Sequence, residues 1–333
     1  MAFSQELYEQ AKAEINKHRN QAEMEAERKR EAYKRRNPEY ARITAELSAT
    51  SGELVKRIFS FGGDDVSIDD IRERNLTLQM RAVELLAADG LAPDAFAPAY
   101  SCPACSDTGV KDGETCECVS RAMKKLAYEK LNKATPLELC SFDSFSLEHY
   151  PETPLAGTPL TVRRQMERMY NYCRKYAEEF SIGSQSLLMQ GGVGLGKTHL
   201  SLAIAGRVIE RGFNVVYGSA QELFTRVESE KFGRDRSGDT LSLLKECDLL
   251  IIDDLGAEFS TSFTVSVMYD ILNTRMQRSL PTIVSTNLGF ELLTQRYDER
   301  IVSRLGSSFR RLLFAGRDLR VILRKKNADD SAE

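Results

Sequence analysis

The stretch Gln190–Thr198, which reads QGGVGLGKT, constrains the fold of this chain more than any other segment. It fits the phosphate-binding pattern G-x-x-x-x-G-K-[ST]. Its glycines let the backbone curl, so that successive N–H groups point at one phosphate. Lys197 adds a point charge for the β- and γ-phosphates, and the Thr198 hydroxyl is placed to bind Mg²⁺. The predicted nucleotide-binding residues are Gly191, Gly192, Val193, Gly194, Leu195, Gly196, Lys197, Thr198 and His199.

Length, charge and hydropathy limit the classes of protein that remain. The 333 residues suffice for about two domains. The net charge of -3 gives no general attraction to nucleic acid or membranes, so such binding would need a local patch. No apolar run approaches the roughly 18 residues of a membrane span, and the N-terminal residues lack the apolar core of a secretory signal. The sequence therefore predicts a cytoplasmic protein with no membrane partner.

Four of the seven cysteines gather in one segment, at Cys102, Cys105, Cys116 and Cys118. They form a C-x-x-C pair and a C-x-C pair, with tight turns predicted at Thr108-Gly109 and Asp112-Gly113. This spacing predicts a structural Zn²⁺ site, because four thiolates leave no open position for catalysis. The alternatives are four free thiols or a redox C-x-x-C, although the strand–helix context of a redox motif is missing. Cys140, Cys173 and Cys247 are predicted to be small core residues.

The chain is predicted to have three parts: residues 1–95, 96–134 and 135–333. The first is rich in Glu, Lys, Arg and Ala with helical spacing, which predicts a helical region. That this region binds a partner is implied by the family resemblance given below. Its basic run, Arg28–Arg36, is either a solvated helix face or a nucleic-acid or partner contact. A helix over Ile68–Leu91 is expected to pack through one face, formed by Leu76, Met80, Val83, Leu86 and Ala87.

A second motif follows the phosphate loop about fifty residues later. Leu249–Ile252 is a predicted buried strand that ends in Asp253-Asp254. Asp253 would hold Mg²⁺, and Asp254 would act as the general base for the attacking water. The alternative is that the two carboxylates merely cap a strand end.

Other segments complete the expected α/β domain. Asn287 follows the predicted strand Pro281–Thr286, where ligands of open α/β sheets collect. Phe309–Phe314 and Leu319–Leu323 are predicted to be the last strands. Two upstream aromatic residues, Phe142 and Phe145, are either core residues or flank an adenine.

Four segments in this order resemble AAA+ ATPases of the DnaC/DnaI type, the bacterial replicative helicase loaders. They are GGVGLGKTHL, LLIIDDLGAE, STNL around Asn287 and RIVSRL around Arg304. The resemblance covers about Leu137–Arg324, and the four cysteines followed by CSFDSFSLEHY are similar to the DnaI side of the group. IstB-type ATPases, which assist transposases, share the ATPase core.

The resemblance implies a fold and a set of roles. The expected fold is α/β: a P-loop AAA+ core with a parallel sheet flanked by helices and no full lid, preceded by a helical and four-cysteine zinc-binding region. ATP, Mg²⁺ and Zn²⁺ are the implied cofactors. The implied catalytic residues are Lys197, Asp253, Asp254, Asn287 as sensor 1 and Arg304 as an arginine finger, with Arg300 as runner-up.

The implied function is ATP-dependent loading of a replicative hexameric DNA helicase onto single-stranded DNA, with self-association through the ATP sites. Asp254 stands where many AAA+ proteins have Glu, so hydrolysis is expected to be slow. Fewer than thirty residues follow Arg304, too few for a full lid, and Arg317 and Arg320 are candidates for a lid-type sensor. The alternatives are an IstB-type transposase helper, a metabolic P-loop kinase, and a coiled-coil module with a vestigial nucleotide site.

Overall fold

The computed structural model describes residues 5–59, 68–133, 140–233 and 239–321. The chain forms two compact units. One comprises Gln10–Ala122, here called the N-terminal unit. The other combines Met1–Glu9 with Met123–Glu333 and is here called the ATPase unit, after the family that its sequence motifs resemble. Because these units are defined by compactness alone, the predicted boundaries of the three functional parts stay predictions.

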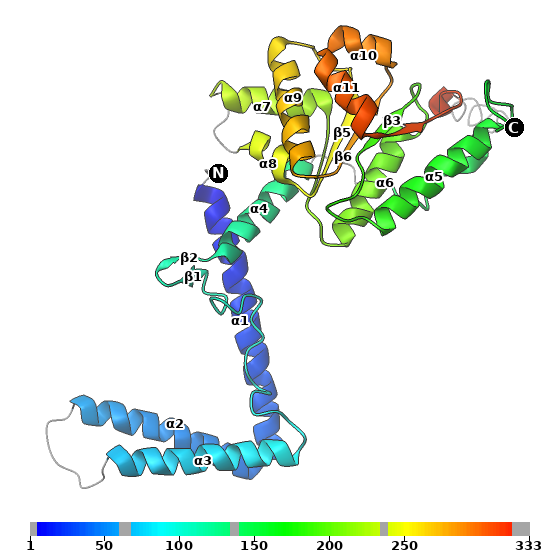
Figure 1. The fold of residues 1–333 in the computed structure, drawn as a ribbon. Helices are drawn as coiled ribbons and strands as arrows, with labels where there is room; N and C mark the ends of the chain where they lie inside the picture. Colours follow the sequence, from blue (N-terminus) through cyan, green and yellow to red (C-terminus); the bar gives the residue numbers. More distant parts are fainter. Residues whose placement is uncertain (1–4, 60–67, 134–139, 234–238, 322–333) are drawn as a thin grey trace, which may run out of the picture. The chain divides into compact units, whose positions relative to one another are not determined.

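A five-stranded parallel sheet forms the centre of the ATPase unit (Figure 1). Its strands are β3 (Leu187–Gln190), β4 (Val215–Ser219), β5 (Leu249–Leu255), β6 (Thr282–Thr286) and β7 (Arg310–Leu313), in the order β4-β5-β6-β3-β7. The strands read as continuous apolar runs because both faces of the sheet are covered. The predicted α/β core with a parallel sheet is confirmed.

Helices cover the two faces of this sheet. One face packs on α5 (Val162–Glu178) and α6 (Lys197–Glu210), through alternate residues such as Leu187 and Met189. The neighbouring residue, Leu188, points to the other face. That face is covered by α4 (Glu117–Asn132), α7 (Ala220–Lys231), α8 (Thr240–Glu246), α9 (Ser262–Gln277), α10 (Phe290–Arg296) and α11 (Glu299–Ser308).

Strand β4 lies at one edge of the sheet, where the end of helix α4 meets it. The Asn132 side chain donates from Nδ2 to the Val215 carbonyl at 2.6 Å. Its Oδ1 accepts from the Tyr217 backbone N–H at 3.0 Å. The Asn132 side-chain amide therefore makes the two hydrogen bonds that a further strand would make with the edge strand β4. These contacts hold the backbone around Tyr217 in place.

The C-terminal segment differs from the expectation. Leu319–Val321 is helical, so the strand predicted over Leu319–Leu323 is wrong for these residues. The Asp318 carboxylate accepts from the Arg320 backbone N–H at 2.9 Å, and the Leu319 N–H donates to the Gly194 carbonyl at 3.1 Å. The segment therefore packs on the phosphate loop instead of extending the sheet. Residues 322–333, on which the expectation of a missing lid partly rests, lie outside the described residues.

The N-terminal unit contains most of α1 (Gln5–Arg36), with α2 (Pro38–Phe59) and α3 (Ile68–Ala88). Helices α2 and α3 pair antiparallel, since Glu39 contacts Arg81 while Glu46 contacts Arg74. A small apolar cluster lies between α1, α2, α3 and the segment after α3. Its side chains include Tyr33, Tyr40, Leu86 and Phe96.

The apolar face predicted for α3 is largely unpacked. Leu86 is buried, but Leu76, Met80 and Val83 are 52%, 67% and 41% exposed. Helical spacing marks the positions that share a face, but it does not say whether a second element covers that face. The expectation that these three residues pack in a core is therefore wrong.

The basic run in α1 forms intrahelical ion pairs. Lys29 contacts Glu25, Arg30 contacts Glu27 and Lys34 contacts Glu31, all at 2.8 Å. Pairs at these spacings are typical of a solvated helix face. In the described part of the chain, no helix is long and apolar enough to cross a membrane.

Candidate nucleotide and metal sites

The phosphate loop connects β3 to α6, and its glycines have backbone conformations that other residues rarely adopt. Gly194 and Gly196 have φ angles of 69° and 85°. A Cβ on Gly194 would lie 1.9 Å from the Asp318 carboxylate, and one on Gly196 would lie 2.8 Å from the Phe145 ring. The positive φ angles favour glycine at both positions, and at Gly196 the Phe145 ring also leaves little room for a side chain.

Lys197 lies at the start of α6 and is buried. Its Nζ donates to the carbonyls of Gly191 and Gly192 at 2.8 and 2.7 Å, and to Asn287 Oδ1 at 2.5 Å. Burial lowers the pKa of the ammonium group, against the opposing effect of the nearby Asp254 and Asp253 carboxylates. The structure thus brings the phosphate-loop lysine and the predicted sensor, Asn287, into direct contact.

The Asp253 carboxylate lies at the end of β5 and is 5% exposed. Its Oδ2 accepts from the Thr198 hydroxyl at 2.8 Å and from the Tyr217 hydroxyl at 2.7 Å. Its Oδ1 accepts from the Ser285 hydroxyl. A carboxylate beside a threonine hydroxyl is the set of oxygen ligands that Mg²⁺ takes next to phosphates.

Asp254 projects from an irregularity in the sheet. The register between β5 and β6 shifts between Ile252 and Leu255, and Asp254 has a φ of 55°. Such bulges re-aim side chains beside active sites. The exposed Asp254 carboxylate accepts from Asn287 Nδ2 at 2.8 Å. The second acid therefore points into the site and does not simply end the strand.

A cavity of about 340 Å³ lies over these groups. It is bordered by the phosphate loop, by Asp254, Ser285 and Asn287, and by Arg320 from the C-terminal segment. Arg320 lies near enough to Lys197 to disfavour its charged form. The sequence left Arg320 as one of two sensor candidates, and the packing of its segment on Gly194 brings it to the cavity.

Arg304 lies elsewhere, on helix α11, and is not among the described residues that line this cavity. Its guanidinium lies 4.7 Å from the Tyr269 ring centre and donates to Asn273 Oδ1 at 3.2 Å. Arg300 lies 4.9 Å from the same ring centre and pairs with Asp298. Both candidate fingers are thus held on one surface formed by α9 and α11.

The aromatic residues upstream of the loop serve different purposes. Phe145 stacks on Tyr150 and Tyr170 and contacts the His199 ring edge-to-face, which favours a role in packing under the phosphate loop. Phe142 lines a second cavity of about 390 Å³ between α5 and α6. Cys140 is partly buried, packs against the edge of the core on the α5–α6 face and lines both cavities, so it is a core residue only in part.

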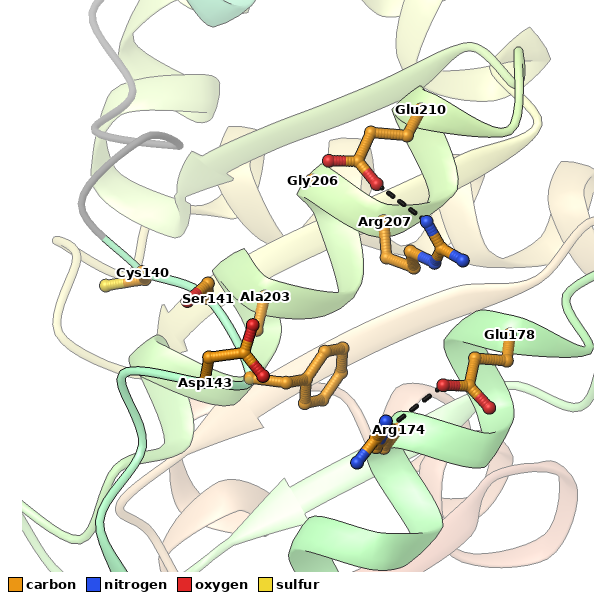
Figure 2. Close-up of a pocket in the computed structure, with 10 residues that line it drawn as sticks. Cys140, Ser141, Asp143, Arg174, Glu178, Ala203, Gly206, Arg207 and Glu210 are labelled. Atoms are coloured by element: carbon orange, nitrogen blue, oxygen red, sulfur yellow. Dashed lines mark hydrogen bonds and ion pairs between the residues drawn. The ribbon is translucent and has the colours of Figure 1, made fainter.

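The second cavity carries charges of both signs (Figure 2). Arg174 and Glu178 form an ion pair on α5, at 3.1 Å, and Arg207 and Glu210 form one on α6, at 2.9 Å. The Asp143 side chain adds a further carboxylate. Because each guanidinium already has a carboxylate on its own helix, neither cation is left as an anchor for an anionic ligand.

The four clustered cysteines meet in the N-terminal unit. Their Sγ atoms all lie within 4.8 Å of one another, with 3.9 Å between Cys102 and Cys116 and 3.5 Å between Cys105 and Cys118. Sulfurs bound tetrahedrally to Zn²⁺ at about 2.3 Å would lie roughly 3.8 Å apart. The donor set therefore fits Zn²⁺.

Local turns bring these cysteines together. A two-residue hairpin links β1 (Val110–Lys111) to β2 (Glu114–Thr115), with positive φ at Asp112 and Gly113, as an Asp-Gly turn favours. Burial raises the pKa of the Cys105 thiol, but the Gly109 N–H and the neighbouring thiols outweigh this effect and lower it to about 7. Burial and the neighbouring thiols raise the pKa of Cys118 instead, so the metal-free cluster favours a thiolate at Cys105 rather than at Cys118.

Comparison with known proteins identifies relatives of the ATPase unit. Residues 176–306 match the sequence model of the IstB-like ATP binding protein family. The chain is 26% identical over 188 residues to the replicative helicase loader DnaC of Escherichia coli (strain K12), covering 56% of this chain and 71% of DnaC. It is 24% identical over 168 residues to the DnaC of Buchnera aphidicola subsp. Acyrthosiphon pisum, covering 50% and 63%. The chain is a relative of the DnaC-type AAA+ proteins.

Two solved structures are also similar in part. One is a crystal structure of the DnaC helicase loader, with 20% identity and a TM-score of 0.46, covering 55% of this chain and all of that one. The other is a crystal structure of DnaI, with 23% identity and a TM-score of 0.44, covering 56% and 94%. The resemblance inferred from the sequence is confirmed by the DnaC sequence relatives and the family match.

Two residues that contact the predicted metal ligand were missed from the sequence. Tyr217 lies in β4 and Ser285 in β6, the strands on either side of β5. Both are polar residues near the C-terminal ends of otherwise apolar strands. That position was the available signal, because the C-terminal ends of neighbouring parallel strands meet at the ligand edge of the sheet.

Proposed function

We propose that this protein is an ATP-dependent loader of the replicative DNA helicase onto single-stranded DNA. The observation that carries the proposal is the similarity to DnaC over 188 residues of this chain. It is joined by a site in which Lys197, Thr198, Asp253 and Asn287 converge. This site has the groups that Mg²⁺ and ATP need, which favours a switch over a vestigial nucleotide site.

Nucleotide binding changes the partners of these side chains. In the structure Lys197 contacts Asn287 and the Thr198 hydroxyl contacts Asp253. With ATP bound, Lys197 would hold the β- and γ-phosphates, and Thr198 and Asp253 would hold Mg²⁺. Mg²⁺, when bound, neutralises the developing phosphate charge. Asp254 orients the attacking water, with Asn287 holding its carboxylate. Because an aspartate reaches less far than a glutamate, hydrolysis is slow and the protein works as a switch.

Self-association completes the site. Arg304 is held by Tyr269 and Asn273 away from the cavity of its own chain, which suits a finger that reaches the ATP of a neighbouring subunit. Arg300 is tied to Asp298 and is the less available of the two. ATP would then favour an assembled state, and hydrolysis would release it.

Exposed aromatic rings give a candidate surface for single-stranded DNA. Phe232, 62% exposed, lies 5.6 Å from the Phe263 ring, and Phe259 on the loop after Asp254 is 82% exposed. Lys231 adjoins Phe232 in the sequence. Exposed rings beside a basic residue are suited to stacking with unpaired bases while contacting the phosphate backbone. Phe259 follows β5, the strand that carries Asp253 and Asp254, so nucleotide binding at these acids could change the position of the Phe259 loop.

The N-terminal unit would grip the helicase. Its four-cysteine cluster fits a structural Zn²⁺, and helix α3 leaves Leu76, Met80 and Val83 exposed. The IstB-type alternative, an ATPase that assists a transposase, is favoured by the family match over residues 176–306. That match covers the ATPase core that both groups share, whereas the cysteine module favours the loader.

A binding experiment separates these functions. The full-length protein is mixed with the replicative helicase of its own organism, with and without Mg²⁺–ATP, and the complexes are separated by size-exclusion chromatography. We expect a helicase complex that acquires single-stranded DNA with ATP, and loss of this ATP dependence in Lys197→Ala. Lys175→Ala, at an exposed lysine on α5, is the matched control. Failure to bind helicase, together with binding to a transposase, would establish the alternative.

A further inference from the structure

Three side-chain hydroxyls donate hydrogen bonds to the Asp253 carboxylate. Ser285 donates to one oxygen, and Thr198 and Tyr217 share the other. Ser285 also accepts from the Asp254 N–H at 2.9 Å and so connects both acids to β6. Of the three donors, only Thr198 belongs to the phosphate loop. Tyr217 comes from β4, a strand that the nucleotide cavity does not otherwise use.

Tyr217 is itself held in place by its surroundings. Its side chain is 9% exposed and lies in the core cluster on the α5–α6 face of the sheet. Its backbone N–H donates to the side-chain oxygen of Asn132, at the end of α4, and this contact holds the β4 backbone in place at Tyr217. A tyrosine fixed at both backbone and ring presents its hydroxyl in one position, 2.7 Å from Asp253.

We propose that Tyr217 is a positioning residue for the metal-binding carboxylate of Asp253, and that Asn132 fixes Tyr217 through its backbone. The inference rests on the proposed function, since it assumes that Asp253 serves Mg²⁺ and ATP. Tyr217 does not touch the nucleotide or the metal. It orients the carboxylate that does.

The physical reason lies in the change at Thr198. In the structure Thr198 supplies one of the two hydrogen bonds to Asp253 Oδ2. When that hydroxyl serves as a metal ligand, Tyr217 remains the donor that fixes this oxygen, while Ser285 fixes the other. Without the Tyr217 hydroxyl, the Asp253 side chain would be less fixed before the metal binds. Ordering it on binding would then cost free energy and weaken the metal affinity. Loss of outer-shell partners of this kind typically lowers metal affinity about 10- to 100-fold.

The test is a titration of Mg²⁺ into the full-length protein with a fluorescent ADP analogue, in which nucleotide binding is measured rather than turnover. For Tyr217→Phe we expect an unchanged nucleotide affinity in EDTA and a Mg²⁺ midpoint raised about 10-fold or more, with binding restored at high Mg²⁺. Asn132→Ala keeps the hydroxyl and removes only the backbone contact, so it should shift the midpoint in the same direction but less.

Tyr176→Phe is the matched control. This buried hydroxyl has no hydrogen-bond partner among the described residues, so its removal should leave the midpoint unchanged. If Tyr217→Phe and Asn132→Ala both titrate like the wild type, the inference is overturned while the proposed function stands. Equal losses of affinity in EDTA and in Mg²⁺ would also overturn it, because they indicate general damage. If the wild type binds no nucleotide, the proposed function and this inference are both wrong.

Discussion

The ATPase unit and the N-terminal unit are stabilised in different ways. In the ATPase unit, strands β3, β5 and β6 are almost fully buried between two layers of helices. In the described part of the N-terminal unit, α2 and α3 are joined by exposed ion pairs such as Glu39–Arg81, and an aromatic cluster around Tyr33 packs between the helices. This unit also contains the four-cysteine cluster, in which a bound Zn²⁺ would stabilise the segment in addition to apolar burial.

This difference explains where function is placed in each unit. A sheet that is buried on both faces holds its strands in fixed positions. The hydroxyls of Tyr217 and Ser285, on the two neighbouring strands, can therefore both donate to the Asp253 carboxylate. The helices of the N-terminal unit leave some apolar side chains exposed, and Met80 on α3 is one of them. The first arrangement suits chemistry that needs fixed geometry, and the second suits recognition.

Removing the metal should give the largest effect and should be confined to the N-terminal unit. Binding of Zn²⁺ to such a site contributes on the order of 10 kcal/mol to folding. Chelation of the full-length protein should therefore unfold the cysteine segment, seen as rapid proteolysis within residues 96–122, while nucleotide binding persists. Cys105→Ser should reproduce the effect, and Cys140→Ser, outside the cluster, should not.

Acid should act in the same direction as the chelator. The Gly109 N–H and the neighbouring thiols lower the pKa of Cys105 against the effect of burial, so the thiolate at this residue stabilises the folded cluster, and acid removes that contribution. Protons also compete with Zn²⁺ for every thiol. If zinc content and protease resistance were unchanged after chelation, the contrast between the units would have to rest on something other than metal.

A buried cation should give the next largest effect, this time in the ATPase unit. Arg275 has no exposed surface and donates to the carbonyls of Leu244, Cys247 and Pro281. Arg275→Met would leave these carbonyls buried without a donor, at a cost of about 3–5 kcal/mol. Urea denaturation should show a lower midpoint for the ATPase unit. Arg278→Met is the exposed control, with an expected change below about 0.5 kcal/mol.

The two units also differ in how much of their structure can be predicted from the sequence. Apolar runs and glycine spacing predict β3, the phosphate loop and Asp253, since these patterns are local. The contacts of Tyr217 with Asp253 and of Leu319 with Gly194 join segments distant in the sequence, and no local pattern encodes them. In α3 the spacing predicts a helix correctly, but burial of Met80 depends on whether a second element covers it.

The smallest effects on stability are expected in helix α3. A matched pair of substitutions there compares a buried side chain with an exposed one. Leu86 is 3% exposed and packs with Tyr33 and Tyr40, so Leu86→Ala should destabilise the N-terminal unit by about 2–4 kcal/mol. Met80 is 67% exposed, so Met80→Gln should change stability by less than about 0.5 kcal/mol. Thermal unfolding followed by circular dichroism measures both.

The same pair separates packing from recognition. If the exposed face of α3 contacts the helicase, Met80→Gln should weaken that complex in a pull-down although its unfolding temperature matches the wild type. Nucleotide binding should remain normal in both variants, because Met80 and Leu86 belong to the N-terminal unit. A Met80→Gln protein that binds helicase normally would mean that the exposed apolar face serves another purpose, and the helicase contact would then have to be sought on the remaining surface of this unit.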